Sequence, residues 1–460
     1  MIWLYVAFRS IPFRDGDRGV FASMGERIAA GDILYVDVWD NKEPLFFLTI
    51  GAGRLLSPTM DVILELAWIF MASLAIYQIM RKLQGSRLMA VLAGFGGTPL
   101  IVTGGTYAAG FSHLPATTIF LGIIALAVHR KWVAVGALIV VLAGFKLIVV
   151  PVAILGLIPL LAGSHWRNSF LRVASGVAAT GVALTLLLTW RGEFIGFINL
   201  IRSNIGYSQS SIADAYDVPI LKHIEPVFSQ STVITVCAAL IIVTLVYIVN
   251  PHVNRAFRAT VGLSLLGAFI VTAITGLWEH HGQLFYGPAA LALALLFGSI
   301  ASLSIPRMAN VLLVMLVSFV LAAMPSLRAV MDTVLSGPTR FHDLSRVAQP
   351  TQDLLDIAQS GTYQRLGMNT DDSHAYGLQN FDLNCYQFVQ YTYDLQETLN
   401  YIPACLPTTG YVLVDRGFTM RDGSPTWNEF VRKSEMVLST DFNCIERDWG
   451  RLCTNTKVSE

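Results

Sequence analysis

The sequence predicts an all-α polytopic membrane protein with a small α/β domain at its C-terminal end. The 460 residues are 54% hydrophobic and 13% charged, whereas soluble domains are about 25% charged. Mean hydropathy is +0.57. Residues 1–325 carry 20 Lys and Arg against 14 Asp and Glu, and residues 326–460 carry 11 against 17. These values exclude a single soluble globule, a disordered chain and a nucleic-acid binder, which would present a basic face.

Ten apolar stretches between residues 62 and 325 have the composition of membrane spans, although some are shorter than the ideal of about 20 residues. They are 62–80, 88–103, 112–128, 133–145, 147–163, 170–189, 232–249, 259–277, 287–304 and 308–325. The apolar stub Met1–Phe8 makes an eleventh, which Arg9 interrupts. We expect this first span to be truncated by a start site placed too late. A short or re-entrant segment is the alternative.

The loops between alternate spans differ sharply in charge, which predicts their orientation. One set contains ten basic residues and no acidic one: Arg81, Lys82, Arg87, Arg130, Lys131, Arg167, Arg172, Arg255, Arg258 and Arg307. The positive-inside rule places these loops in the cytoplasm. The loops at 9–60, 190–231 and 278–286, and the whole domain 326–460, are then extracytoplasmic. The protein is therefore expected in the cytoplasmic membrane, in contact with the lipid bilayer.

The first extracytoplasmic loop has more charged residues and amphipathic stretches than a simple connection between two spans needs. Its stretches Gly25–Ala30 and Pro44–Leu56 predict short amphipathic helices at the membrane surface. Its carboxylates Asp15, Asp17, Asp37 and Asp40 occur with the cations Arg18 and Lys42. Carboxylates beside cations suit acid–base chemistry on an amphiphilic substrate with a phosphate head group. The alternative is a loop held together by its own ion pairs.

Four of the five cysteines lie in the C-terminal domain, namely Cys385, Cys405, Cys444 and Cys453, and Cys237 lies in an apolar span. An even set in one domain predicts disulfides and an oxidising compartment, in agreement with the topology. We favour Cys444–Cys453 among the three pairings, because 442–454 predicts a hairpin that turns at 448–449. Four reduced thiols are the alternative. The spacing does not match a zinc site.

The domain 326–460 is expected to be small and α/β. We predict a helix at Thr351–Gln359, a buried strand at Tyr411–Asp415 and a helix at Thr426–Glu435, before the hairpin. The domain has no glycine-rich phosphate loop and no nucleophile motif. Its acidity and its Tyr and Trp content suit contact with an acceptor glycan. A folding cap for the membrane part is an equal alternative.

Several motifs in residues 1–325 resemble one family. They are Asp17-Arg18-Gly19-Val20-Phe21, the run from Gly25 to Gly31, Tyr35-Val36-Asp37-Val38-Trp39-Asp40-Asn41-Lys42-Glu43-Pro44, Gly144-Phe145-Lys146, and His280-His281-Gly282-Gln283 followed by Tyr286-Gly287-Pro288. This order resembles bacterial GT-C glycosyltransferases, the relatives of dolichyl-phosphate-mannose protein mannosyltransferases and of the aminoarabinose transferase. The motif of the first loop is specific, and the two later matches are weak by themselves.

The resemblance implies an inverting glycosyltransferase that takes its sugar from a polyprenyl-phosphate carrier and passes it to an extracytoplasmic glycan, lipid or protein. Asp17 matches the catalytic base that accepts the proton of the acceptor hydroxyl, and an N-cap or turn role is its alternative. Lys42 would stabilise the leaving phosphate, and Asp40 would orient Lys42 and the loop. The expected substrate-binding residues are Asp37, Asp40, Lys42, Lys146, His280, His281 and Tyr286.

The later candidates have plainer alternatives. Lys146 is an intramembrane cation that suits a lipid phosphate, or it extends along its span to the surface. His280 and His281 are adjacent and cannot share one helix face, which favours hydrogen bonding at the interface over metal ligation.

This chain also departs from the family pattern. Arg18 stands where the family often has Glu, and Gly104–Gly110 carries no acid where many members do. We therefore expect no metal cofactor. Because these carboxylates are missing, a catalytically inactive scaffold is an alternative function. A transporter or flippase of a lipid-linked sugar is less favoured, because no internal repeat or mid-membrane acid is visible.

Overall fold

The computed structural model describes residues 17–38, 40, 42–57, 60–84, 87–88, 90–91, 93–94, 97, 101, 112–162, 165–202, 230–249, 255–275, 279–301, 363–366, 403–420, 425–448 and 450–457. The chain divides into two compact units. We call Met1–Ile11, Thr59–Leu187 and Ser211–Pro338 the helical unit, and Pro12–Pro58, Leu188–Ser210 and Thr339–Glu460 the second unit. The domain boundary predicted at residue 325 lies outside the described residues.

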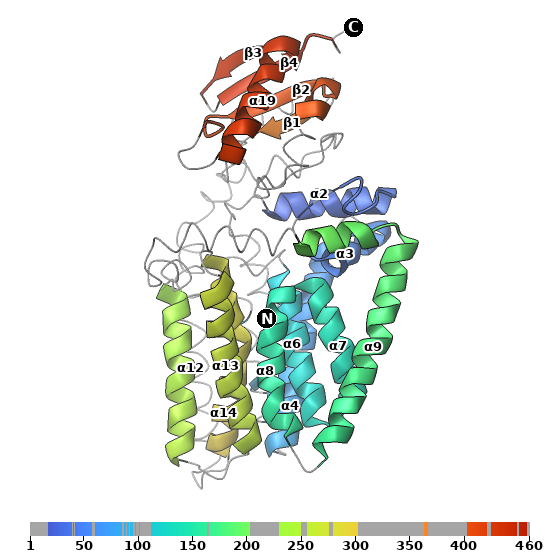
Figure 1. The fold of residues 1–460 in the computed structure, drawn as a ribbon. Helices are drawn as coiled ribbons and strands as arrows, with labels where there is room; N and C mark the ends of the chain where they lie inside the picture. The colour runs from blue at the N-terminus through green and yellow to red at the C-terminus, as the bar shows by residue number, and fades with distance from the viewer. Residues whose placement is uncertain are drawn as a thin grey trace. The chain divides into compact units, whose positions relative to one another are not determined.

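The helical unit is a bundle of apolar helices (Figure 1). Its helices are α4 (Met60–Gln84), α6 (His113–Val128), α7 (Trp132–Phe145), α8 (Val150–Leu161), α9 (Trp166–Trp190, whose last three residues belong to the second unit), α12 (Gln230–Val249), α13 (Arg255–Thr275) and α14 (Tyr286–Ala301). The 3₁₀ segment η1 (Leu147–Val149) precedes α8, and η2 (Glu279–Phe285) precedes α14. Helix α6 packs against α4, α7 and α8, while α8 packs against α13 and α12 against α14.

Three of the described helical stretches are long and apolar enough to cross a membrane, namely Ile63–Leu83, Trp166–Trp190 and Arg255–Ile274. Helices α7 and α8 have 14 and 12 residues, or about 21 and 18 Å at 1.5 Å per residue, which is less than the roughly 30 Å of hydrocarbon core. Only parts of the predicted span 88–103 are described, and 308–325 lies outside the described residues. The count of eleven spans stays a prediction.

Small residues let the helices of the bundle approach closely. A Cβ atom at Gly156 of α8 would overlap Ser264 of α13. One at Gly267 of α13 would come within 3.1 Å of the Val152 backbone of α8. Because lipid is as apolar as the side chains, helices in membranes associate through such close packing rather than through hydrophobic burial. The crossing of α8 and α13 is therefore typical of a membrane bundle.

In the second unit, two helices of the first loop pack against each other. They are α2 (Asp17–Ala30) and α3 (Pro44–Leu56). Phe21 of α2 lies edge-on to Phe46 and Phe47 of α3, with ring centroids 5.0 and 5.7 Å apart. Helix α3 has the bounds that the sequence predicts, because Pro44 suits the first turn of a helix. Helix α2 begins eight residues before the predicted start.

The C-terminal part of the second unit contains a four-stranded sheet beside α19 (Pro425–Asp441) (Figure 1). The strand order is β1-β2-β4-β3, with bounds β1 (Tyr363–Leu366), β2 (Tyr411–Asp415), β3 (Phe442–Arg447) and β4 (Gly450–Asn455). The short 3₁₀ helix η5 (Leu406–Thr408) precedes β2. Strand β1 is parallel to β2, and the other two pairs are antiparallel. The C-terminal part therefore contains a small sheet with a helix beside it, and the domain bounds 326–460 stay a prediction.

The hairpin of β3 and β4 pairs Arg447 with Gly450 at its closed end and places Cys444 opposite Cys453. These two cysteines form a disulfide. Cys405 is also disulfide-bonded, whereas Cys385 lies outside the part of the chain that the structure describes. Of the described cysteines, Cys237 is free and exposed.

Candidate functional site in the first loop

The segment 31–43 between α2 and α3 is a compact turn. Gly31 and Tyr35 have positive φ angles of 111° and 67°, and the Tyr35 amide donates to the Val38 carbonyl. A backbone bridge joins Leu34 to Val38. The exposed Asp37 accepts a hydrogen bond from the Ile33 amide through Oδ2 at 2.8 Å. Asp37, predicted to bind substrate, here holds the turn.

The buried Asp40 and the partly buried Lys42 form a pair at the end of this turn. The Asp40 side chain is 0% exposed, and its Oδ1 accepts a hydrogen bond from the Lys42 amide at 3.0 Å. The Lys42 Nζ lies 3.9 Å from the same oxygen and 5.6 Å from the centroid of the Phe21 ring. A carboxylate and an aromatic face both favour a fixed cation. The Lys42 ammonium is thus held in one place, with 18% of its side chain exposed.

Tyr35 connects the two halves of the turn. Its hydroxyl donates a hydrogen bond to the Lys42 carbonyl at 2.7 Å. Burial raises the pKa of this hydroxyl well above its ordinary value, and the carboxylates of Glu43, Asp40 and Glu193 raise that pKa further. Tyr35 therefore stays protonated and remains a donor at every physiological pH.

Glu193 is a site residue that the sequence reasoning did not single out. It lies three residues after the end of α9, and its side chain is 0% exposed. Its Oε1 accepts hydrogen bonds from Arg191 Nε at 2.7 Å and from the Leu34 amide at 3.4 Å. Burial raises the pKa of the Glu193 carboxyl, against the opposing effect of Arg191. No short sequence pattern could have found it, because Leu34 is 159 residues away.

The expected catalytic base, Asp17, is the first residue of α2. Its side chain and the whole of Asp15 lie outside the described parts of the structure. The position at the start of a helix fits both alternatives, since the first turn favours a carboxylate whatever its further role.

In the helical unit, Lys146 is buried at the junction of α7 and η1. The residue is 5% exposed and has an extended backbone, with φ −165° and ψ 96°. Its Nζ donates a hydrogen bond to the Ser112 hydroxyl at 3.2 Å. The Lys146 side chain is therefore buried among the helices of this unit and is not exposed on its surface.

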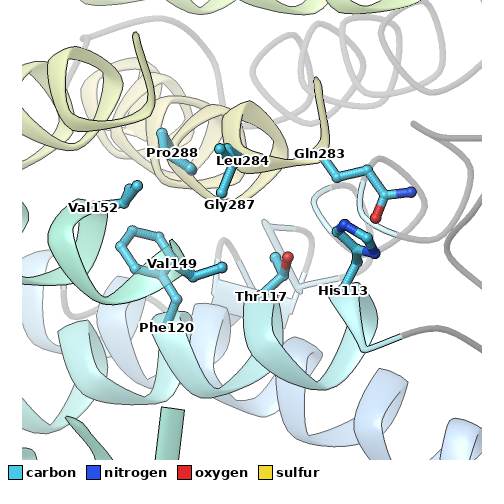
Figure 2. A pocket seen from close by; sticks show the side chains of 9 residues that line it. All are labelled: His113, Thr117, Phe120, Val149, Val152, Gln283, Leu284, Gly287 and Pro288. Atoms are coloured by element: carbon cyan, nitrogen blue, oxygen red, sulfur yellow. The ribbon is translucent and has the colours of Figure 1, made fainter. Parts of the chain in front are cut away.

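A narrow pocket lies beside the start of α6 (Figure 2). Its cavity volume is about 10 Å³, the space of roughly one water molecule. Figure 2 shows the side chains of His113 and Gln283 at one end, with Thr117 next to them. The remaining lining residues are Phe120, Val149, Val152, Leu284, Gly287 and Pro288.

The later family-like motif borders this pocket. His281 of η2 is 8% exposed and Tyr286, the first residue of α14, is 3% exposed. The backbone of His280 lies in η2, and its side chain is not among those described. Within the described residues, no group of three or more His, Cys, Asp or Glu side chains is close enough to hold a metal ion.

Comparisons with known proteins leave the family open. No family model matches the chain, and no curated protein sequence matches it. One similar solved structure is the Archaeoglobus fulgidus oligosaccharyltransferase in complex with zinc and sulfate. That likeness covers 97% of this chain and 70% of the other, with 11% identity and a TM-score of 0.43. A likeness at this TM-score carries no argument about fold or function.

Proposed function

We propose that the protein is a membrane glycosyltransferase that moves a sugar from a polyprenyl-phosphate carrier to an acceptor hydroxyl outside the cytoplasmic membrane. One observation carries the proposal: a folded loop holds Lys42 against the buried Asp40, inside the motif that resembles GT-C enzymes. Apolar helices of spanning length support a membrane setting.

In the proposed reaction, Asp17 accepts the proton of the acceptor hydroxyl while the hydroxyl oxygen forms a bond to the anomeric carbon of the sugar. The bond between that carbon and the phosphate oxygen breaks with inversion, and the polyprenyl phosphate leaves with the electron pair. Lys42 stabilises the negative charge on the departing phosphate. Asp40 keeps the ammonium fixed, so that little reorganisation is needed as the charge develops.

Residues of the helical unit complete the proposal. Lys146 is a buried cation next to a helix break, and such groups in a membrane are commonly functional. We propose that it binds a lipid phosphate. His280, His281 and Tyr286 would supply hydrogen bonds to a sugar or a phosphate, and Asp37 stays a predicted substrate-binding residue whose carboxylate also accepts a hydrogen bond from the Ile33 amide.

The test is sugar transfer by membranes that contain the protein. A panel of radiolabelled polyprenyl-phosphate sugars would be compared between the wild type and Asp17→Asn. Asp32→Asn is the matched control, because this carboxylate belongs to an ion pair with Arg27 at the other end of α2. We expect Asp17→Asn to lower transfer by about 10²- to 10⁴-fold, and Asp32→Asn to retain most of it.

Other outcomes would redirect the proposal. Equal, nonzero activity of the wild type and Asp17→Asn would remove Asp17 as the base and make Asp15 and Asp40 the next residues to test. Binding of a lipid-linked sugar without transfer, by both proteins, would favour an inactive scaffold. Movement of the carrier across vesicles without transfer would favour a flippase.

A further inference from the structure

The segment after α9 begins a second, short helix with a buried acid at its start. Residues 194–202 are helical, and the Glu193 carbonyl accepts a hydrogen bond from the Phe197 amide at 2.9 Å. The Glu193 amide in turn donates to the Leu188 carbonyl at 2.8 Å. Glu193 is therefore fixed by its backbone on both sides, and its side chain has a defined direction.

That side chain is directed at the first loop. Its Oε1 accepts from the Leu34 amide and from Arg191. Its Oε2 is buried and has no hydrogen-bond partner among the described residues. Burying a carboxylate oxygen without a partner is costly, and the raised pKa of Glu193 reflects that cost. A buried carboxylate in such an unfavourable environment is a candidate for a functional role.

The same segment also packs closely against Tyr35. Gly196 lies so close to Tyr35 that an added Cβ would overlap the Tyr35 Cβ. Tyr35 itself has a left-handed backbone and donates its hydroxyl hydrogen bond to the Lys42 carbonyl. A shift of Tyr35 would therefore move Lys42. Glu193 and Gly196 thus contact adjacent residues, Leu34 and Tyr35, of the turn that presents the ammonium.

We infer that Glu193, together with Gly196, is a positioning residue that sets the place of the Lys42 ammonium for the phosphate of the lipid carrier. The identity of the ligand in this inference rests on the proposed function. The mechanical part, that Glu193 and Gly196 set the position of Lys42, does not. Glu193 acts through Leu34, Tyr35 and Lys42 and takes no part in the bond changes.

The mechanical part is tested without any substrate, by hydrogen exchange of the purified full-length protein in detergent. In Glu193→Ala, amides 34–42 should exchange about fivefold faster, the effect of one lost hydrogen bond. Glu193→Gln retains an acceptor for the Leu34 amide, and near neutral pH its amides 34–42 should be protected at least as well as those of the wild type. Gly196→Ala should also loosen the turn. Gly181→Ala is its matched control, since that helical glycine has open space around it.

The ligand part is tested with decaprenyl phosphate, which carries no sugar, by binding to the same variants. We expect Lys42→Ala to weaken binding about tenfold, and Glu193→Ala about fivefold. The double variant should bind about tenfold more weakly rather than fiftyfold, because residues that act through one contact are not additive. A general loss of structure would instead multiply the two effects.

The outcomes separate the two claims. Unchanged exchange of amides 34–42 in Glu193→Ala overturns the positioning role, whatever the protein binds. Faster exchange with additive losses of binding overturns the link between Glu193 and Lys42. If the wild type does not bind decaprenyl phosphate while exchange responds as expected, the positioning of Lys42 stands and the proposed lipid-phosphate donor is wrong.

Discussion

The second unit contains two tight reversals of the chain that are held in different ways. The turn at 31–43 combines short-range backbone hydrogen bonds with three backbone amides that donate to the carboxylates of Asp37, Asp40 and Glu193, of which Asp37 is exposed and the other two are buried. The hairpin at 442–455 depends on backbone pairing between its own strands and on the Cys444–Cys453 disulfide. Its charged groups lie near the surface.

The difference shows where a single substitution should matter. A ladder of backbone hydrogen bonds persists when one side chain changes, because each bond belongs to the main chain. A buried carboxylate cannot be replaced so easily, since its removal leaves donors without an acceptor. The first loop should therefore be sensitive to single changes and the hairpin tolerant, which is typical of a functional loop beside a structural element.

The largest loss of local stability is expected for Asp40→Ala. Removing one partner of a buried ion pair commonly costs about 3 kcal/mol or more, and Asp40 also accepts the Lys42 amide hydrogen bond. The measurement is the free energy of local opening from hydrogen exchange of amides 33–43. Asp37→Ala is the matched control, because its carboxylate is exposed and one hydrogen bond contributes about 1 kcal/mol. Equal losses in both variants would contradict the distinction between buried and exposed acids.

The features predicted well from the sequence are those with local signals. The start of α3 follows from Pro44. The end of α3 and the end of β2 (Tyr411–Asp415) follow from the apolar pattern. The hairpin register follows from a two-residue turn. In each case the residues that decide the structure are neighbours in the sequence, so that periodicity and turn chemistry are sufficient.

The features that were missed depend on distant parts of the chain. Strand β1 has four residues and pairs in parallel with β2, some 45 positions later, which leaves no local pattern. Helix α2 begins at Asp17 rather than Gly25, because Phe21 packs on Phe46 and Phe47 of α3. That contact offsets the weak helix propensity of Gly19.

Within the candidate site, the sequence named Asp40 and Lys42 but not their support. The motif makes this pair visible, whereas the contact between Glu193 and Leu34 spans 159 residues. The junction at Lys146 differs, because the predicted stretches 133–145 and 147–163 already meet at this residue, where α7 ends and η1 begins. The burial of Lys146 against Ser112, 34 residues earlier, had no local signal.

A somewhat smaller effect is expected when the disulfide is removed. Cys444 and Cys453 are nine residues apart, and closing a loop of this size stabilises by about 2.5 kcal/mol in the chain-entropy model. In the double variant Cys444→Ala, Cys453→Ala, amides of β3 and β4 should exchange faster while their pairing remains. Cys237→Ala, at a free cysteine, is the control. Complete loss of protection in both strands would show that the ladder depends on the disulfide.

The pH dependence of the first turn follows from the raised pKa of Glu193. A carboxyl whose pKa is higher in the folded state contributes its stability when protonated, and this contribution falls as pH rises through the folded-state pKa. Glu193→Gln resembles the protonated form. It should therefore match the wild type in acid and be at least as stable near neutral pH, as measured by the opening of amides 34–42. A variant that is less stable at neutral pH would mean that the Arg191 ion pair outweighs the burial.

The smallest loss of stability is expected for Glu435→Ala in α19. Its carboxylate pairs with Arg451 of β4 through two hydrogen bonds and raises the pKa of that guanidinium. Both side chains are about one-third exposed, and pairs of this kind contribute about 0.5 kcal/mol. The matched control is Glu429→Ala, which removes an ion pair with Lys433 one turn away on the same helix. Both losses, measured by exchange of the β4 amides, should shrink further in 1 M salt. A loss for Glu435→Ala as large as that for Asp40→Ala would mean that the hairpin, like the first loop, depends on its carboxylates.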